Sequence, residues 1–217
     1  FNFGLHSMYL SNSKRVWKVI FNLTTSPSLV PKYIANLLSR KDPIELQLPW
    51  WSYDSISYIQ KSRFDKCFEW GSGGSTLFLA KICKSLKTIE NDLDWYNKVN
   101  AELQCKKLDN VSIKHEEIEL SDPDSFRRSA YLNSLNEKYD LITIDGQDDF
   151  GPESTWSARE LCFERAQAFI KPEGMIIVDD SWRYPEIDKK SKAKKILRFE
   201  SVGPSRKGVT RTDIHHY

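Results

Sequence analysis

A glycine-rich loop is the segment of this sequence whose residue types point most directly to ligand binding. It reads Glu-Trp-Gly-Ser-Gly-Gly-Ser-Thr over residues 69–76, between an apolar run and a helix-like segment. Glycines such as Gly71 and Gly73 let a backbone turn sharply and approach a ligand closely. The start of the following helix presents N–H groups and a positive dipole to a negatively charged group. We therefore predict a ligand-binding loop that uses Gly71, Ser72, Gly73 and Ser75.

A carboxylate follows this loop at the spacing expected of a nucleotide-binding unit. Glu90 ends the next apolar run, 19 residues after Gly71, and Asn91 comes directly after it. In a βαβ nucleotide site, an acidic residue about 20 positions along the chain hydrogen-bonds the ribose hydroxyls. We expect Glu90 to take this role and Asn91 to lie beside it in a cofactor site.

Three further carboxylates stand at the ends of two later apolar runs. Asp145 follows YDLITI, and Asp179 and Asp180 follow GMIIV. The ends of neighbouring parallel strands meet at one edge of a sheet, where open α/β sheets bind their ligands. Acids placed there can remove a proton from a hydroxyl group, and oxygen ligands without soft neighbours favour Mg²⁺. We predict Asp145 and Asp179 as catalytic residues, and Asp145, Asp179 and Asp180 as Mg²⁺ ligands.

Two more acids, Asp148 and Asp149, lie close enough to Asp145 in the sequence to replace one of these ligands. We expect the substitution Asp148→Ala to reduce activity less than Asp145→Ala does. Equal losses of activity in the two variants would contradict the role assigned to Asp145.

Short apolar runs alternate with helix-like segments from residue 64 onward. The predicted strands are 64–70, 86–90, 111–116, 139–145 and 174–180, and the predicted helices are 75–83, 93–108, 122–135 and 153–170. This alternation is typical of a parallel sheet covered by helices on both faces. Residues 194–205 and 207–217 read as two further strands joined in a hairpin. The predicted fold class is α/β, a Rossmann-like three-layer sandwich with a mostly parallel seven-stranded sheet and an antiparallel terminal hairpin.

The first 60 residues lack this alternation. Val16, Val19, Ile20 and Leu23 recur at helical spacing. Further helices are predicted over 28–39 and within 48–62. We therefore divide the chain into a helical N-terminal extension, residues 1–60, and a main domain, residues 61–217.

The loop pattern E-x-G-x-G-x-S, from Glu69 to Ser75, resembles motif I of the class I S-adenosylmethionine-dependent methyltransferases. IDG at 144–146 resembles the motif IV of that family, and GMIIVDDSW at 174–182 resembles its fifth strand. The resemblance covers residues 60–217 and implies S-adenosylmethionine as the cofactor, with Asp145 near its methyl group. The residues that it implies at the cofactor are Glu69, Gly71, Ser72, Gly73, Ser75, Glu90, Asn91, Glu117 and Asp145.

The acids after the fourth and fifth strands also resemble those of the metal-dependent O-methyltransferases of the macrocin and catechol types. In those enzymes such acids hold Mg²⁺ against substrate hydroxyls. The resemblance implies methyl transfer to a small-molecule acceptor, a hydroxyl of a sugar or natural product, with assistance from Mg²⁺. The expected partner is then a small molecule, and nucleic acid is not the expected substrate.

Two other functions stay open at this point. An NAD-dependent oxidoreductase uses a similar loop, although Glu69 and Thr76 fit its G-x-G-x-x-G fingerprint poorly. A non-catalytic nucleic-acid-binding protein would use the basic segment 183–217, which has ten Lys or Arg against four Asp or Glu. The lysine cluster at 189–195 lacks interleaved aromatic residues, which argues against stacking on RNA bases.

Composition narrows the class of protein further. The 217 residues include 32 Lys or Arg and 30 Asp or Glu, and the net charge of +2 gives the whole chain no strong attraction to nucleic acid or membranes. No apolar run approaches the ~20 residues that a membrane span needs. The four cysteines form no CxxC pair, so we predict free thiols, a reducing compartment and a cytoplasmic location. A homodimer stays among the expected assemblies.

Overall fold

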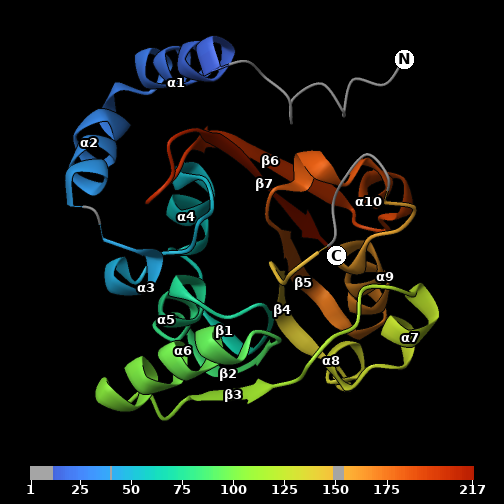
Figure 1. The fold of residues 1–217 in the computed structure, drawn as a ribbon. Helices are drawn as coiled ribbons and strands as arrows, with labels where there is room; N and C mark the ends of the chain where they lie inside the picture. The colour runs from blue at the N-terminus through green and yellow to red at the C-terminus, as the bar shows by residue number, and fades with distance from the viewer. Residues whose placement is uncertain (1–11, 40, 149–153) are drawn as a thin grey trace.

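The computed structural model describes residues 12–39, 41–148 and 154–217, whose helices and strands are arranged as in Figure 1. A seven-stranded sheet forms the centre, in the order β3-β2-β1-β4-β5-β7-β6. The strands are β1 (Phe64–Trp70), β2 (Cys83–Glu90), β3 (Val111–His115), β4 (Tyr139–Ile144), β5 (Ile170–Val178), β6 (Lys195–Val202) and β7 (Val209–His216). β1 to β5 pair in parallel, and β7 is antiparallel to both β5 and β6. The predicted Rossmann-like α/β sheet with its terminal hairpin is confirmed.

Helices cover both faces of this sheet (Figure 1). They are α1 (Asn12–Thr25), α2 (Val30–Ser39), α3 (Pro43–Leu46), α4 (Tyr53–Ile59), α5 (Gly74–Leu79), α6 (Leu93–Cys105), α7 (Pro123–Arg128), α8 (Ala130–Asn133), α9 (Ala158–Phe169) and α10 (Pro185–Lys190), with 3₁₀ turns η1 (Pro27–Leu29) and η2 (Ser181–Arg183). Side chains from α7 to α10 fill the core on one face, together with Ile142 and Ile144 of β4. Side chains from α2, α4 and α5 fill the core on the other face, together with Leu141. Neighbouring strand residues thus point to opposite faces, which produces the three-layer sandwich.

The segment 122–135, predicted as one helix, is divided at Ser129 into α7 and α8. The backbone of Ser129 is extended, and its hydroxyl accepts a hydrogen bond from the backbone N–H of Leu132 at 3.2 Å. An extended residue ends the first helix, and a serine in that place caps the second. The short helices α3 and α10 were not predicted from the sequence.

Two other helix boundaries differ from the predicted ones. The helix predicted over 75–83 ends at Leu79, because the chain from Cys83 onward pairs with β1. The helix predicted from residue 153 begins at Ala158, after the cap residue Ser157. The start of that prediction, like the residue Asp149, lies in 149–153, outside the part of the chain that the structure describes.

The predicted N-terminal extension contributes to the same core as the sheet. Trp51, Tyr53 and Ile59 are fully buried among residues of β1, β2 and β4. The backbone N–H of Ser52 donates to the hydroxyl of Thr212 on β7 at 3.1 Å. Residues 1–11 of this extension lie outside the described part of the chain. Across the described ranges, no helix has the length and apolar character required to cross a membrane.

The prediction of four free thiols is wrong for two of the cysteines. Cys67 on β1 and Cys83 on β2 form a disulfide, with their Cα atoms 6.3 Å apart, while Cys105 and Cys162 are free. Adjacent strands bring the two residues together, although 16 positions separate them in the sequence and no spacing rule marks the pair. A disulfide of this kind is typical of oxidising surroundings, so the cysteines no longer support the predicted reducing, cytoplasmic location.

We expect a thiol count to reveal this bond. Unfolding the protein in guanidinium without reductant should expose only the two thiols of Cys105 and Cys162 to a thiol reagent, and prior reduction should raise the count to four. Reduction should also lower the free energy of unfolding by about 3 kcal/mol, because a loop of this length loses its constraint on the unfolded chain. Four reactive thiols in the unreduced protein would contradict the pairing.

Candidate active site

The glycine loop connects β1 to α5 at the carboxyl edge of the sheet. Gly71 has φ of +86°, a conformation that favours glycine. A Cβ atom on Gly71 would lie 2.6 Å from the backbone nitrogen of Gly146 and 2.7 Å from the carbonyl carbon of Asp145. The ends of β1 and β4 therefore touch at this point, and only glycine allows that approach.

The N–H groups at the start of this loop are bonded within the protein. The backbone N–H of Gly71 donates to the carbonyl of Ile89, that of Ser72 to Glu90 Oε2 at 2.7 Å, and that of Gly73 to Thr76 Oγ1 at 2.9 Å. These three N–H groups are therefore not free to meet a negatively charged ligand in this conformation, while the predicted role of the N–H groups at the start of α5, from Gly74 onward, stays a prediction. The side chains of Glu90 and Thr76 already occupy the positions that a phosphate oxygen would take.

Glu90 joins the glycine loop to the segment that follows β2. Its Oε2 accepts hydrogen bonds from the backbone N–H and the hydroxyl of Ser72, at 2.7 and 2.8 Å. Its Oε1 accepts from the backbone N–H groups of Asn91 and Asp92, at 2.8 and 3.0 Å. A carboxylate has about four acceptor sites, so Glu90 uses its full capacity to shape the two loops.

Glu69 lies behind the loop rather than in the pocket in front of it. The side chain is fully buried and accepts a hydrogen bond from Thr76 Oγ1 at 2.6 Å. Burial raises the pKa of this carboxyl to about 7, because a charge is poorly solvated there. In this conformation Glu69 supports α5 through Thr76, and a direct contact with a cofactor stays a prediction.

The raised pKa of Glu69 predicts a pH-dependent penalty on stability. Between about pH 4.5 and 7 the folded state holds a proton that the unfolded state releases, so the free energy of unfolding falls as the pH rises. We expect Glu69→Gln to remove this contribution, so that wild type loses about 2–3 kcal/mol more than the variant between pH 5 and pH 8. Urea unfolding of both proteins at the two pH values measures the difference. If the free energy of unfolding changed equally in the two proteins between pH 5 and pH 8, Glu69 would not be a buried group with a raised pKa.

A pocket of about 380 Å³, here called the loop pocket, opens in front of the glycine loop. The predicted site residues that line it are Gly71, Ser72, Gly73, Ser75, Glu90, Asn91, Asp145, Asp179 and Asp180. Residues from the ends of β1, β2, β4 and β5 thus meet in one cavity, as expected for an open α/β sheet. Trp50, from the segment before α4, contributes an aromatic side chain to the same cavity.

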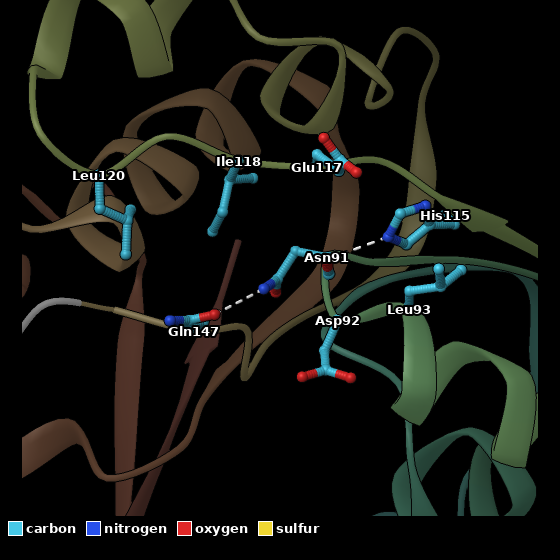
Figure 2. A pocket seen from close by; sticks show the side chains of 8 residues that line it. All are labelled: Asn91, Asp92, Leu93, His115, Glu117, Ile118, Leu120 and Gln147. Atoms are coloured by element: carbon cyan, nitrogen blue, oxygen red, sulfur yellow. Dashed lines mark hydrogen bonds between the residues drawn. The ribbon is translucent and has the colours of Figure 1, made fainter.

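A second pocket of about 530 Å³, here called the flanking pocket, lies beyond the ends of β2 and β3. Figure 2 shows Asn91 in its centre, with its side-chain amide donating to Gln147 Oε1 at 2.7 Å. His115 Nε2 lies 3.1 Å from the carbonyl oxygen of Asn91. The predicted residue Glu117 lines this pocket together with Ile118. Since Asn91 and Gln147 line both pockets, the two cavities adjoin.

Arginines neutralise two of the three acids that the sequence analysis grouped together. Asp145 Oδ1 lies 3.2 Å from the guanidinium of Arg159 on α9. Asp180 Oδ1 accepts hydrogen bonds from Arg206 at 2.9 Å and from the hydroxyl of Thr210 at 2.7 Å. Arg159 also donates to the backbone carbonyls of Gly146 and Asp179, which ties the ends of β4 and β5 together. The partly buried positive charges of these arginines thus organise the acidic end of the pocket.

The three acids have different protonation preferences. Burial raises the pKa of Asp145 to about 6, although Arg159 opposes the shift. Burial and repulsion from Asp145 and Asp180 raise the pKa of Asp179, whose Oδ1 accepts a hydrogen bond from Thr212 at 2.8 Å. Burial also acts on Asp180, but the nearby Arg206 outweighs it and lowers the pKa of that carboxyl. The raised pKa of Asp145, about 6, suits a general base that works near neutral pH.

These contacts do not fit the predicted Mg²⁺ site. Asp180 is held by arginine and threonine, and Asp179 is buried with a raised pKa that favours its uncharged form. Proteins usually hold Mg²⁺ through one or two ionised carboxylates, with waters or substrate oxygens completing an octahedron. Within residues 12–39, 41–148 and 154–217, no group of three His, Cys, Asp or Glu side chains is arranged to hold a metal ion. We therefore assign no metal-dependent step to Asp145, Asp179 and Asp180.

Asp148 has a structural role that distinguishes it from Asp145. Its two carboxylate oxygens accept hydrogen bonds from the hydroxyl of Ser157 and the backbone N–H of Ala158, at 2.7 and 2.8 Å. The side chain thereby fixes the start of α9, where a negative charge is favourable. This geometry explains why Asp148→Ala should affect activity less directly than Asp145→Ala.

Several residues of the site were not predicted from the sequence. Arg159 and Arg206 line the loop pocket, but they lie far apart in the chain and belong to no recognisable motif. Trp95 of α6 also lines the loop pocket, and its indole N–H donates to the carbonyl of Ser72 at 2.6 Å. The closeness of Trp95 to Glu90 in the sequence was the one available signal.

The basic C-terminal segment does not form a continuous positive surface. Seven of its ten basic side chains are paired with carboxylates in ion pairs or charged hydrogen bonds: Arg183, Lys189, Lys190, Lys194, Arg198, Arg206 and Arg211. The acidic partners include residues outside the segment, such as Glu160 and Glu173. The net charge of a segment read from sequence therefore overstates the positive charge that a ligand would meet.

No protein-family model matches this sequence, and no curated protein matches it. The fold, in contrast, is shared with solved structures. One is a "putative O-methyltransferase" from Klebsiella pneumoniae, with a TM-score of 0.57, 16% identity, and coverage of 94% of this chain and 98% of the other. A "putative rRNA-methylase" from Clostridium thermocellum has a TM-score of 0.53 and 14% identity, with 76% and 96% of the two chains covered.

A third structure with this fold contains a bound cofactor. It is the O-methyltransferase TomG from Streptomyces achromogenes, involved in tomaymycin synthesis and solved with S-adenosylmethionine. It matches with a TM-score of 0.52 and 15% identity, over 74% of this chain and 77% of the other. At such identities the similarity establishes a common fold, while activity has to be argued from the site itself.

Proposed function

We propose that this protein transfers a methyl group from S-adenosylmethionine to a hydroxyl group of a small molecule. The observation that carries the proposal is the acidic lining of the loop pocket. Five carboxyl groups line it, from Glu90, Asp92, Asp145, Asp179 and Asp180, and they outnumber the three guanidinium groups of the lining even when Asp179 is protonated. S-adenosylmethionine carries a sulfonium and an ammonium group, so a pocket with an excess of carboxylates complements its charge. The shared fold with TomG, which binds this cofactor, supports the proposal.

The two adjoining pockets suggest how the cofactor would be divided between them. The flanking pocket offers the amides of Asn91 and Gln147, the imidazole of His115 and the apolar side chain of Ile118, a combination suited to an adenosine group. The loop pocket, bordered by Gly71 and the acids, would hold the methionine end. When bound, the cofactor supplies a methyl group on a sulfonium, which an aligned nucleophile attacks directly.

Asp145 is the residue that we assign to the proton of the acceptor hydroxyl. It lines the loop pocket, and Arg159 fixes one of its oxygens. A carboxyl with a pKa of about 6 is largely ionised at neutral pH and is still a stronger base than an ordinary aspartate. Asp179 lies beside it as a second titratable group, held by Thr212. No metal ion is needed for this proton transfer.

The two alternative functions have weaker support. An NAD-dependent oxidoreductase needs loop N–H groups for a pyrophosphate, and here Glu90 and Thr76 take up those of Ser72 and Gly73. A nucleic-acid-binding protein needs unpaired basic side chains along a surface, whereas most of those in 183–217 are paired with acids. Because one solved structure with this fold is described as an rRNA-methylase, RNA remains the control substrate.

Transfer of a tritiated methyl group tests the proposal. The labelled cofactor is incubated with the protein and with separate pools of alcohols and phenols, of amines, and of ribosomal RNA, with and without chelator. We expect the label to be incorporated into the pool of alcohols and phenols, to the same extent with and without chelator. The substitution Asp145→Asn should lower that rate by about 10²–10⁴-fold, while the affinity for S-adenosylhomocysteine stays within about threefold. Incorporation of label only into the amine or RNA pool would contradict the proposal. So would the loss of incorporation when chelator is added.

A further inference from the structure

The helix α1 is attached to the edge of the sheet by one of its faces. Val19 and Leu23 pack against the core cluster that contains Val202 of β6. The backbone N–H of Val202 donates to Asn22 Oδ1 at 3.0 Å, and the Asn22 amide donates to the carbonyl of Glu200 at 3.3 Å. These bonds cover part of β6, the last strand of the sheet. The helix therefore has a defined orientation on the body of the protein.

The opposite face of α1 is apolar and exposed to solvent. It consists of Val16, Trp17, Ile20 and Phe21, whose exposed fractions are 57%, 68%, 43% and 70%. At about 100° per residue these four side chains fall within an arc of about 140°. We call these four residues the α1 outer face. An exposed group of large apolar side chains on one side of a helix marks an interaction surface rather than ordinary surface variation.

The next helix adds to the exposed apolar surface of this part of the chain. Ile34 and Leu38 of α2 are 47% and 77% exposed. Figure 1 shows α1 and α2, in blue, as consecutive helices at the margin of the molecule, outside α4. Their outer position leaves these side chains accessible to a large partner.

Charge indicates which kind of partner fits this surface. The first 41 residues contain six Lys or Arg and not one Asp or Glu, a concentration that the whole-chain net charge of +2 conceals. One of the six, Lys18, is paired with Glu200 of β6 at 3.2 Å. A symmetric contact between two copies would place these positive charges against each other, which is unfavourable. A surface rich in anionic lipid attracts them, at about 1 kcal/mol for each Lys or Arg near the surface.

We infer that α1 and α2 form a docking surface for an anionic lipid membrane, with Trp17 and Phe21 entering the headgroup region. The combination of an apolar face carrying Trp and Phe with lysines such as Lys14 beside it is the pattern of helices that lie in the membrane interface. Such a helix binds the surface without crossing it, and no helix of the described residues is suited to crossing. This inference is independent of the proposed methyl transfer.

Sedimentation with vesicles tests the inference. Full-length protein is mixed with vesicles of phosphatidylcholine alone or of phosphatidylcholine with phosphatidylglycerol. We expect binding to the anionic vesicles only, weakened by salt. The double variant Trp17→Ser/Phe21→Ser should bind at least about tenfold more weakly, and Lys14→Gln/Lys41→Gln about tenfold more weakly. The matched control is Leu93→Ser. Leu93 is 54% exposed on α6, outside α1 and α2, so its replacement should leave vesicle binding unchanged. Circular dichroism confirms that each variant is folded.

Three results would overturn the inference. The first is the absence of binding to anionic vesicles by folded wild-type protein. The second is equal binding by wild type and the Trp17→Ser/Phe21→Ser variant. The third is a wild-type dimer in analytical ultracentrifugation that the same double variant converts to a monomer, since the α1 outer face would then be an interface between copies.

Discussion

Replacing Gly71 by alanine is expected to abolish cofactor binding and to destabilise the fold. The new Cβ atom would lie within 2.7 Å of the backbone of Asp145 and Gly146, and the residue would have to keep φ at +86°. Overpacking and backbone strain each cost about 1–3 kcal/mol. We therefore expect Gly71→Ala to lower the free energy of unfolding by about 2–5 kcal/mol. The affinity for S-adenosylhomocysteine should fall at least about 100-fold, because the loop pocket is built where β1 and β4 meet.

Gly208→Ala is the matched control for this substitution. A Cβ atom on Gly208 would meet nothing within 4 Å, and its φ is not in the left-handed region. Urea unfolding and calorimetric titration with S-adenosylhomocysteine measure both effects in both variants. If Gly71→Ala bound the ligand as well as Gly208→Ala does, the contact between the two strand ends would not be required for the site.

Replacing Glu90 by alanine is expected to have the second largest effect. The substitution would leave the backbone N–H groups of Ser72, Asn91 and Asp92 without their acceptor. A buried donor left unpaired costs about 1–3 kcal/mol, and water can reach part of this site. We expect a loss of about 3 kcal/mol in the free energy of unfolding, and affinity for S-adenosylhomocysteine at least about 100-fold lower.

Two further variants separate the support of the loops from direct ligand contact. Glu90→Gln keeps one acceptor oxygen. Its free energy of unfolding and its affinity for S-adenosylhomocysteine should therefore lie between those of wild type and Glu90→Ala. Glu117→Ala removes an exposed carboxylate of the flanking pocket, so it should weaken binding by less than about tenfold without changing the unfolding free energy. A Glu90→Ala variant with wild-type stability and weak binding would mean that Glu90 acts on the ligand and not on the loops.

The positions of the site residues could be predicted because strand ends are visible in the sequence. Apolar runs that stop at Trp70, Glu90 and Ile144 place the residues after them at one edge of a parallel sheet. The structure brings Gly71, Asn91 and Asp145 together in one pocket for this reason. The order of apolar runs and helix-like segments along the chain was also enough to predict the sheet and its terminal hairpin.

The electrostatic surroundings of those residues could not be predicted, because they depend on side chains distant in sequence. Arg159 comes from α9 and Arg206 from the turn between β6 and β7, and no spacing relates them to Asp145 or Asp180. The Mg²⁺ site was predicted because the sequence shows the three acids but not the arginines that pair with them in the fold. The disulfide was not predicted for a similar reason, since only the pairing of β1 with β2 brings Cys67 near Cys83.

The roles of Glu69 and Glu90 show a second limit of sequence reasoning. Both were placed near the cofactor on the strength of their positions, yet their observed hydrogen bonds go to the protein's own loops. A carboxylate beside a glycine turn can bind a ligand or the turn itself, and only the direction of its side chain decides between them. Such buried carboxylates stabilise the loops that define the pocket.

Calorimetric titration of the folded protein with S-adenosylmethionine, S-adenosylhomocysteine and NAD decides whether the loop pocket and the flanking pocket bind the proposed methyl donor. The acidic loop pocket and its flanking pocket predict binding of both sulfur-containing ligands at a single site in the micromolar range, with no binding of NAD. The affinities should be the same with Mg²⁺ and with chelator. Folded protein that binds neither S-adenosylmethionine nor S-adenosylhomocysteine, or that binds NAD in their place, would contradict the account.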